Sequence, residues 1–279
     1  MIDLHLHTTA SDGRSTPEAL VDEVFAAGVR TLAVTDHDTM AAGPAVAAAA
    51  AARGMTFVPG IEITAVARGR DVHVLGYFLD AGDGELAAFL DAQRNDRRRR
   101  VVEIVAKLRE LGAPVAVTPD DIEGGAGGGR AIGRPFVAQA LVSAGHARDI
   151  ADAFDTFLGD GRPAFIPRRG ASPAEVVGLI ARAGGLSSLA HPGKLRLDAI
   201  IDELIDAGLT AIEAYHPDHR DADVERYVAR ARSSGLLVTG GSDYHGPGSG
   251  RTGGLGQVSL PAPDFAALAA RADARPQGA

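Results

Sequence analysis

Short apolar runs alternate with Ala-rich segments of helical periodicity along most of the chain. We predict strands at residues 2–7, 31–37, 56–64, 71–79, 186–191, 210–216, 236–243 and 255–260. We predict helices at residues 17–27, 41–53, 173–183, 197–207 and 221–233. Several of these helices begin with a Pro or follow a Ser/Thr cap. The alternation indicates an α/β protein whose sheet is mostly parallel, with helical crossovers between its strands.

One connection is too short for this scheme. Only residues 65–70 separate the third apolar run from the fourth, whereas a parallel crossover needs about a dozen residues. The run at 71–79 is therefore predicted to return antiparallel to 56–64, as the second strand of a hairpin.

Residues 85–165 interrupt the alternation. They contain a long Arg-rich helix at 86–111, a glycine loop at 124–129 and further helical turns to residue 158. The glycine loop lacks the Lys-Ser/Thr ending of a phosphate-binding loop, so it is interpreted as a flexible link. We predict a discontinuous barrel at 1–84 and 166–262, a helical insertion or substrate domain at 85–165, and a C-terminal tail at 263–279, whose last dozen residues are expected to be frayed.

Residue types that bind metals gather where the predicted strands end. In the first run, alternation places Asp3, His5 and His7 on one face of the strand. His73 begins its strand, but the antiparallel return brings that start to the same rim. The C-terminal rim of a parallel barrel is where active sites are built. The other candidates at this rim are Asp12, Asp36, His37, Asp38, Glu62, His191, Glu213, His216, Asp243 and His245.

Such a concentration of polar side chains predicts a multinuclear metal site. Without compensation, burying so many polar groups costs several kcal/mol. The chain contains no Cys, so disulfides and thiolate ligands are excluded and the donors must be His and carboxylate groups.

The bulk composition limits the possible partners. The chain has 279 residues, of which 46% are hydrophobic, and a formal net charge of −8. This charge argues against a protein that coats long nucleic acid. No apolar run approaches the length of a membrane helix, and the start is too polar for a secretory signal. We expect a cytoplasmic enzyme, and no feature requires more than a monomer.

The segments DLHLHT, SDG, TDHDT, GIEIT, HVLGY, AHPGK and GSDYHG occur in this order along nearly the whole chain. In this combination the sequence resembles the polymerase and histidinol phosphatase (PHP) family of metal-dependent phosphoesterases. The resemblance implies a distorted, TIM-like (β/α)7 barrel that holds up to three divalent metal ions. The implied ligand sets are His5, His7, Glu62 and Asp243 for one ion, Asp12, His37 and His245 for a second, and Glu62, His73 and His191 for a third.

The implied site suits hydrolysis of a phosphate ester. Three dications, three carboxylates and a bridging hydroxide leave a surplus of about two positive charges, which attracts a phosphate dianion. The hydroxide would attack phosphorus in line. His and carboxylate ligands favour Mn²⁺, with Fe²⁺ or Zn²⁺ as alternatives. Asp36 or His216 is expected to manage the leaving-group proton. Asp3 and Asp38 are expected to orient ligand histidines, with helix capping as the alternative for Asp38.

Within the family, the chain resembles the branch of 3′,5′-nucleotide bisphosphate phosphatases and 5′-to-3′ oligoribonucleases, because of its insertion. Arg130 and Arg134 can each offer a bidentate fork to a non-scissile phosphate. Most of the Arg run on the long helix is interpreted as a solvated face, with Arg97 and Arg100 pointing at the cleft. Lys194 is expected to contact phosphate. Aromatic residues make up only 5% of the chain, too few to stack an extended strand, so we expect a mononucleotide or a very short oligonucleotide.

Several competing functions remain open from the sequence. A histidinol-phosphate phosphatase or a phosphodiesterase acting on cyclic or other small esters would share the metal site. An amidohydrolase also begins with His-x-His on a barrel strand, but it commonly uses a carboxylated Lys, and Lys107 and Lys194 do not lie at suitable strand ends. A polymerase-associated binding module would normally be fused to a far longer chain.

Overall fold

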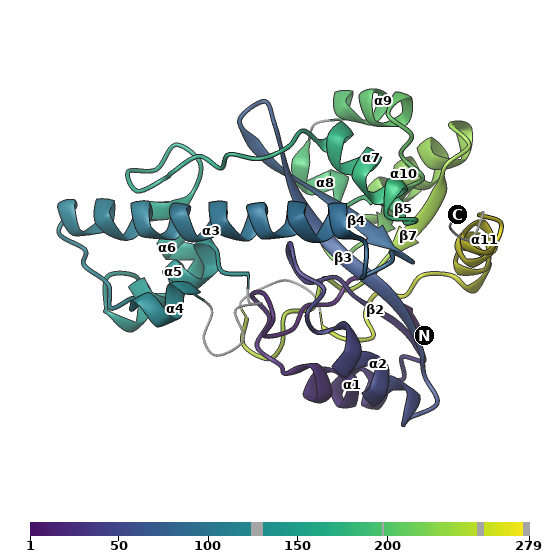
Figure 1. Ribbon diagram of the computed structural model, residues 1–279, viewed down its shortest axis with the longest axis horizontal. Coiled ribbons are helices and arrows are strands. Elements are labelled where there is room, and N and C mark those ends of the chain that lie inside the picture. Colours follow the sequence, from purple (N-terminus) through teal and green to yellow (C-terminus); the bar gives the residue numbers. More distant parts are fainter. Residues whose placement is uncertain (124–130, 197, 250–253, 276–279) are drawn as a thin grey trace.

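A single sheet of seven strands curves into a nearly closed barrel in the computed structural model (Figure 1). The structure describes residues 1–123, 131–196, 198–249 and 254–275. The strands follow one another in sequence order, and the parallel bridge between Leu6 and Tyr244 joins the segments that follow the first and last strands. The strands are β1 (Ile2–Asp3), β2 (Thr31–Val34), β3 (Thr56–Ala67), β4 (Arg70–Tyr77), β5 (Leu186–Leu189), β6 (Ala211–Tyr215) and β7 (Leu237–Gly240). The predicted α/β barrel is confirmed.

The predicted hairpin is confirmed as well. Strand β4 runs antiparallel to both β3 and β5, whereas the other neighbouring pairs are parallel. The register pairs Thr64 with His73 and Glu62 with Leu75, so that His73 is the diagonal neighbour of Glu62 on one face of the sheet. The hairpin thus delivers a histidine from the start of β4 to the end of the barrel where the parallel strands finish.

Two predictions for the C-terminal part of the chain are wrong. Residues 255–260 form no strand: the segment begins with a turn, and only near its end does it reach the first strand, where the Leu260 N–H donates to the Ile2 carbonyl oxygen. Residues 262–273 form a helix, α11 (Ala262–Asp273), which extends into the last dozen residues that were expected to be frayed. Leu268 of α11 is fully buried in a cluster that includes Leu4, Val58 and Tyr77. The helix is therefore ordered because it covers barrel side chains that would otherwise meet water.

Helices cover the outside of the barrel. Thr16 and Ser172 cap the first turns of two of them, as their positions in the sequence predict. The described helices around the barrel, besides α11, are α1 (Pro17–Ala26), α2 (Gly43–Ala51), α7 (Pro173–Arg182), α8 (Pro192–Leu195), α9 (Ala199–Asp206) and α10 (Asp221–Ser233). Within the described residues no helix has the length and apolar character needed to span a membrane.

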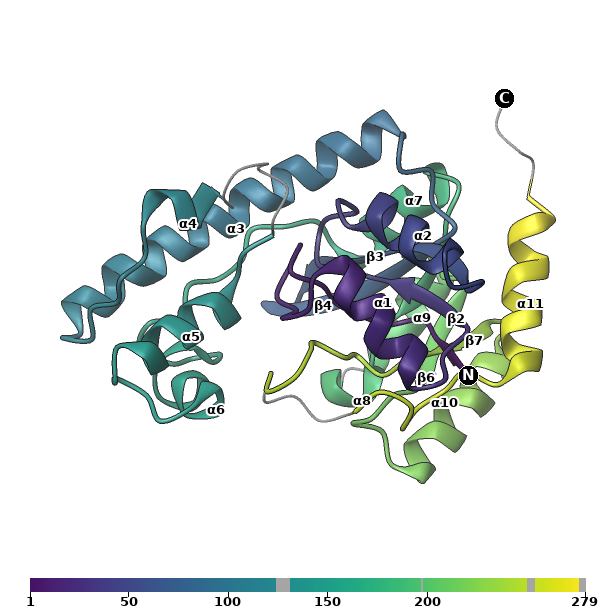
Figure 2. The same ribbon diagram turned by 90° about the horizontal axis from the view of Figure 1, so that it is seen from below.

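The long helix α3 (Gly84–Glu110) joins the barrel to the helical insertion (Figures 1 and 2). Leu86 and Leu90 on its first turns pack in the barrel core. Ile104 and Leu108 on its last turns pack in a separate cluster built from the insertion itself. One rigid helix therefore has its two ends in two hydrophobic cores. The insertion also contains α4 (Pro119–Glu123), α5 (Arg134–Ser143), α6 (Ile150–Ala153) and a π-helical turn, η1 (Phe154–Leu158). The predicted glycine loop at 124–129 lies outside the described residues.

Candidate metal centre

Nine metal-binding side chains predicted from the sequence lie together at the end of the barrel where the parallel strands finish. They come from seven different segments of the chain, and most of them are buried. His73, with 23% of its side chain exposed, is the most open of the nine. We call this set the histidine–carboxylate cluster: His5, His7, Asp12, His37, Glu62, His73, His191, Asp243 and His245.

Two ring nitrogens and two carboxylate oxygens of this cluster lie at the spacing of ligands to one metal ion. The Nε2 atoms of His5 and His7 lie 3.4 and 3.3 Å from Glu62 Oε2, and the same distances from Asp243 Oδ1. Donors placed about 2.0–2.1 Å from a tetrahedral ion lie about 3.3–3.4 Å from one another. Both ring nitrogens of His7 are buried and have no hydrogen-bond partner among the described residues. The spacing therefore fits coordination of a shared cation better than direct hydrogen bonding.

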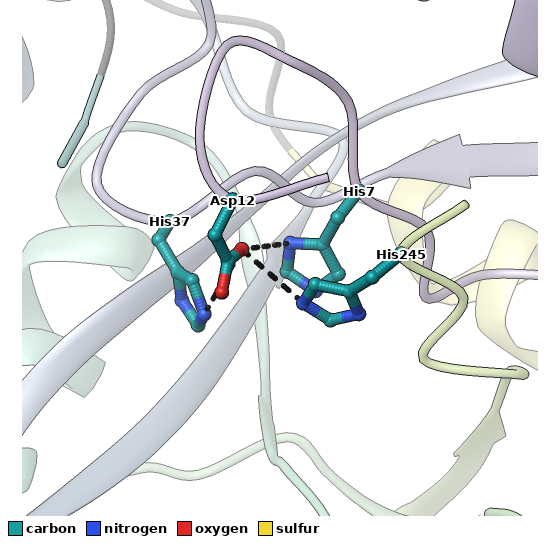
Figure 3. Close-up of side chains that lie close together, drawn as sticks. All are labelled: His7, Asp12, His37 and His245. Atoms are coloured by element: carbon teal, nitrogen blue, oxygen red, sulfur yellow. Dashed lines mark ion pairs between the residues drawn. The ribbon is translucent and has the colours of Figure 1, made fainter. Parts of the chain in front are cut away.

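Asp12 forms the centre of a second group (Figure 3). Its Oδ1 atom lies 3.2 Å from His245 Nε2, 3.8 Å from His37 Nε2 and 3.9 Å from His7 Nδ1. Asp12 reaches this position from the loop after the first strand, which turns back toward the barrel. These four side chains present one oxygen and three nitrogens to a common point, a donor set that suits a divalent ion.

Glu62 links the remaining histidines. Its Oε1 atom lies 2.6 Å from His73 Nδ1 and 3.2 Å from His191 Nε2, and its Oε2 atom lies 3.1 Å from His37 Nδ1. The compact groups around Glu62 pair it with His37 and His73 and, separately, with His5 and His191. Glu62 therefore has one oxygen toward the first donor set and the other toward His73 and His191, as a bridging ligand requires.

Hydrogen bonds fix the tautomers of two of these histidines. His5 Nδ1 lies 2.8 Å from a carboxylate oxygen of Glu213, and His245 Nδ1 lies 2.7 Å from the main-chain oxygen of Asp243. Both partners can only accept, so each Nδ1 carries the proton. The lone pair of each Nε2 then faces the cluster, which is the state a metal ligand needs.

The electrostatics of the cluster are those of a cation site. Burial opposes ionisation of Glu62 and Asp243, but the surrounding histidines outweigh it and hold both carboxyl pKa values well below their usual range. Burial also opposes protonation of His7, yet Asp243 and Glu62 raise its pKa to about 9. For His191, burial prevails and lowers the pKa to about 3. A divalent ion would supply the positive charge that the three carboxylates of the cluster attract, and its binding would displace protons from the histidines.

The two predicted proton-transfer residues have other contacts. The carboxylate of Asp36 accepts hydrogen bonds from the Thr8 N–H and hydroxyl and from the Ser11 hydroxyl, and burial raises its pKa. These contacts hold the loop that carries Asp12. His216 Nδ1 accepts from the Asp218 N–H, so its proton is on Nε2, which points at Asp243 Oδ2. His216 therefore orients Asp243, and its Nε2 has no lone pair for a metal.

The predicted roles of Asp3 and Asp38 are wrong. Asp3 accepts from the main-chain N–H groups of His5 and Ser242 and does not hold a histidine ring; burial raises its pKa to about 6. Asp38 neither orients a ring nor caps a helix, because α2 begins only at Gly43. Its carboxylate accepts instead from the Thr64 N–H and from Arg97 Nε, the latter at 2.6 Å.

A cavity of about 440 Å³ lies between the cluster and the insertion. Asp12, His37, His73 and His245 form one side. Four guanidinium groups line the same cavity, and we call them the arginine wall: Arg97, Arg100, Arg134 and Arg168.

Two carboxylates hold the arginine wall in place. Asp71 Oδ2 accepts from Arg100 at 3.3 Å and from Arg134 at 3.1 Å, and Asp71 Oδ1 lies 3.8 Å from Arg168. Burial raises the pKa of Asp71, but these three arginines outweigh it and lower the pKa to about 2. Asp38 holds Arg97 in the same way, by accepting a hydrogen bond from its Nε atom. Four cations thus face two anions, which leaves the wall with net positive charge.

Some donor atoms of the wall have no hydrogen bond in the described chain, although their guanidinium groups lie near Asp38 or Asp71. Arg168 Nε and Nη1 and Arg100 Nη2 are buried atoms without a hydrogen bond among the described residues. Burial, together with the neighbouring Arg97, lowers the pKa of Arg168 to about 10. Buried donors that line a cavity in this state favour an anion as their partner.

The sequence predicted only part of the arginine wall. Arg97, Arg100 and Arg134 line the cavity as expected, whereas Arg130 lies outside the described residues. Arg168 and Asp71 were missed. Asp71 stands two residues before His73 on the same strand, so its side chain faces the same way, and this periodicity could have identified it. Arg168 lies on the irregular return from the insertion, where no periodicity exists.

Lys194 lies beside the cluster, on the short helix α8 that follows His191. Its Nζ atom is 3.0 Å from Asp218 and 3.5 Å from Asp243. A third of the side chain is exposed, so the ammonium group is accessible from solvent at the edge of the cluster.

Comparison with known proteins agrees with this geometry. The PHP domain family model matches residues 3–120. The 3′,5′-nucleoside bisphosphate phosphatase of Chromobacterium violaceum is 34% identical over 254 residues, which cover 89% of this chain and 88% of the relative. The 5′-3′ exoribonuclease Rnm of Escherichia coli is 33% identical, with 88% and 85% covered. A solved structure from Bifidobacterium adolescentis, assigned by name to the metal-dependent phosphoesterases, superimposes with a TM-score of 0.86 at 32% identity, covering 96% of this chain and 95% of that one.

Proposed function

This chain belongs to the PHP family of metal-dependent phosphoesterases, and from that premise we propose that it hydrolyses the 3′-phosphate of a nucleoside 3′,5′-bisphosphate. The same site would accept the 5′ end of a short oligoribonucleotide. Members of this family use divalent metal ions. We propose that this protein binds two to three of them and that it prefers Mn²⁺ over Fe²⁺ or Zn²⁺. The protein is proposed to act as a monomer on a small phosphorylated substrate.

One observation carries the substrate assignment: a single cavity has two anion-binding sides of different chemistry. Four members of the histidine–carboxylate cluster and the four arginines of the arginine wall line it together. A phosphate at the cluster leaves the arginine wall free to bind a second phosphate of the same molecule. A volume of about 440 Å³ lies in the range of small-ligand pockets. A monophosphate without a second anionic group would leave the buried donors of Arg100 and Arg168 unpaired.

We assign metal binding to the nine residues of the histidine–carboxylate cluster, on the support of their donor spacing and fixed tautomers. When bound, the ions supply an activated water nucleophile and neutralise charge on the phosphoryl oxygens. Lys194 adds a cation beside the reacting phosphate. Arg134 and Arg168 hold the non-reacting phosphate, and Asp71 keeps both guanidinium groups oriented before substrate arrives, which limits the entropy lost on binding.

The experiment that tests this function is phosphate release with Mn²⁺-reconstituted enzyme. Adenosine 3′,5′-bisphosphate, 5′-AMP, histidinol phosphate, a cyclic phosphodiester and a 5′-phosphorylated trinucleotide are compared by kcat/KM. A preference of at least about tenfold for the bisphosphate over 5′-AMP is expected, because the second phosphate gains charge-assisted hydrogen bonds. Equal kcat/KM values for the two nucleotides would show that the arginine wall does not take part in substrate recognition. A preference for the trinucleotide would identify the oligoribonucleotide as the main substrate.

A further inference from the structure

Strand β6 carries a carboxylate that belongs to none of the metal-binding groups. Glu213 is fully buried in the middle of this strand, between neighbours β5 and β7. The sequence placed it at the rim, but the ligand sets implied for the family do not include it. A buried carboxylate needs a partner for each oxygen, so its contacts show what it does.

The two oxygens of Glu213 hold two different cluster segments. Oε1 accepts from His5 Nδ1–H at 2.8 Å, and Oε2 accepts from the main-chain N–H of His191 at 2.8 Å. The first contact fixes the tautomer and the rotation of the His5 ring. The second holds the turn at which β5 ends and His191 enters the cluster.

The contact with His191 acts on an unfavourable backbone conformation. His191 has a φ of 30° and a ψ of 57°, in the left-handed region that a side chain with a Cβ atom disfavours. The turn needs an outside contact to keep this conformation, and the hydrogen bond to Glu213 provides one. Since His191 Nε2 faces Glu62 only from this turn, the main-chain contact also places the ring.

We infer that Glu213 is a positioning residue which couples His5 on one side of the barrel to His191 on another and thereby sets the affinity of the cluster for its ions. It touches neither the substrate nor the ions. Carboxylates that orient ligand histidines typically change metal affinity by 10–100-fold. Glu213 orients one ring directly and a second through the main chain, so we expect an effect in this range.

The test is a calorimetric Mn²⁺ titration of metal-free protein for the wild type, Glu213→Gln and the control Glu225→Gln. Gln keeps the size of the side chain, but its amide group turns one of the two acceptors into a donor that opposes an N–H. Glu213→Gln is expected to bind Mn²⁺ about 10–100-fold more weakly. Glu225, on an exposed position of α10, is expected to have no effect when substituted. Wild-type affinity in Glu213→Gln overturns the inference.

A thermal measurement separates positioning from a merely structural role. Loss of structure alone lowers the Tm of the metal-free and the Mn²⁺-loaded protein by similar amounts, whereas lost positioning reduces the rise in Tm on adding Mn²⁺. If Glu213→Gln does not fold, Glu213→Asp, which keeps the charge and shortens the side chain by one methylene, takes its place. A wild-type rise in Tm for that variant overturns the inference.

The inference rests on the proposed metal binding but not on the proposed substrate. Wild-type protein that binds no Mn²⁺, Fe²⁺ or Zn²⁺ would contradict the proposed function itself. Wild-type protein that binds Mn²⁺, together with a Glu213→Gln variant that binds it equally well, contradicts only the role of Glu213.

Discussion

The two charged sides of the cavity are built in opposite ways. The histidine–carboxylate cluster consists of ring nitrogens and carboxylate oxygens that converge, and several of its buried ring nitrogens, both of those of His7 among them, have no hydrogen bond among the described residues. The arginine wall consists of cations that are mostly satisfied by the protein, through Asp38 and Asp71. The carboxylates of the cluster are proposed to need a metal cation, whereas the guanidinium groups of the arginine wall already have carboxylate partners. The wall has only a few donor atoms without a hydrogen bond among the described residues. From this difference we propose that the metal side decides whether the chemistry occurs and that the arginine side decides on which substrate.

The largest effect is expected from removing a ligand on the metal side. His7→Ala takes away a ring that faces both Glu62 and Asp243, and kcat on any phosphomonoester should fall on the order of 10³-fold or more. The far-ultraviolet circular dichroism should stay unchanged. His146→Ala is the matched control. Its ring lies in the insertion and hydrogen-bonds there to the Pro114 main-chain oxygen, so kcat should stay within about twofold. Turnover of His7→Ala near the wild-type rate would exclude this ring from the reaction.

The arginine side should give a smaller and selective effect. Arg134→Ala removes one guanidinium from the wall, and a charge-assisted hydrogen bond contributes about 1.5–3 kcal/mol. The kcat/KM for adenosine 3′,5′-bisphosphate should fall about 10–100-fold, while that for p-nitrophenyl phosphate should stay within about threefold. Arg148→Ala, an exposed arginine of the insertion paired only with Asp152 in the described chain, should change neither value. An equal loss on both substrates would mean that Arg134 acts on the metal side.

The same contrast explains what the sequence could predict. Most members of the cluster lie in or just after the last residues of an apolar run, and parallel strands end at one rim. Period and topology were therefore sufficient to bring His5, Glu62 and Asp243 together. Arg168 depends on how the insertion folds back over the barrel, which no local pattern encodes. Asp38 was misassigned because position alone does not tell whether a carboxylate after a strand faces a ring, a helix end or a distant guanidinium. Arg97, 59 residues away, is its main partner.

Residues 262–273 show that the fold, too, depends on contacts that the local sequence does not predict. The chain ends in Ala-Arg-Pro-Gln-Gly-Ala, and this ending indicated that the last dozen residues are frayed. The structure orders residues 262–273 because Leu268 covers apolar side chains at the barrel end, including Leu4. The stabilisation comes from contacts distant in sequence, and helical propensity near a terminus gives no measure of it.

Asp71 connects the two sides, and its effect should appear in stability and depend on pH. Its pKa is lowered from 3.8 to about 2, so the ionised carboxylate contributes about 2 kcal/mol that is present above about pH 4 and is lost as the pH falls toward 2. Urea unfolding of metal-free Asp71→Asn should therefore show a deficit of about 2 kcal/mol at pH 7 that narrows between pH 4 and pH 3. Asp206→Asn, at an exposed position of α9, is the control. If the loss in free energy of unfolding does not change with pH, the side chain of Asp71 stabilises the protein by packing and not by its charge.

The smallest effect is expected from an arginine next to the wall that faces away from it. Arg99 pairs with Asp96 and Glu103 on its own helix, at spacings of three and four residues, whereas the adjacent Arg100 lines the cavity. Such partly exposed helix pairs contribute about 0.3–0.5 kcal/mol each. Arg99→Ala should therefore lower the free energy of unfolding by no more than about 1 kcal/mol and leave kcat/KM for the bisphosphate within about twofold. Arg100→Ala, one residue along, should reduce that kcat/KM about tenfold or more, because it removes a buried donor from the wall. If the two variants behave alike, the helix acts through its overall charge, and the division between a solvated face and an arginine wall does not hold.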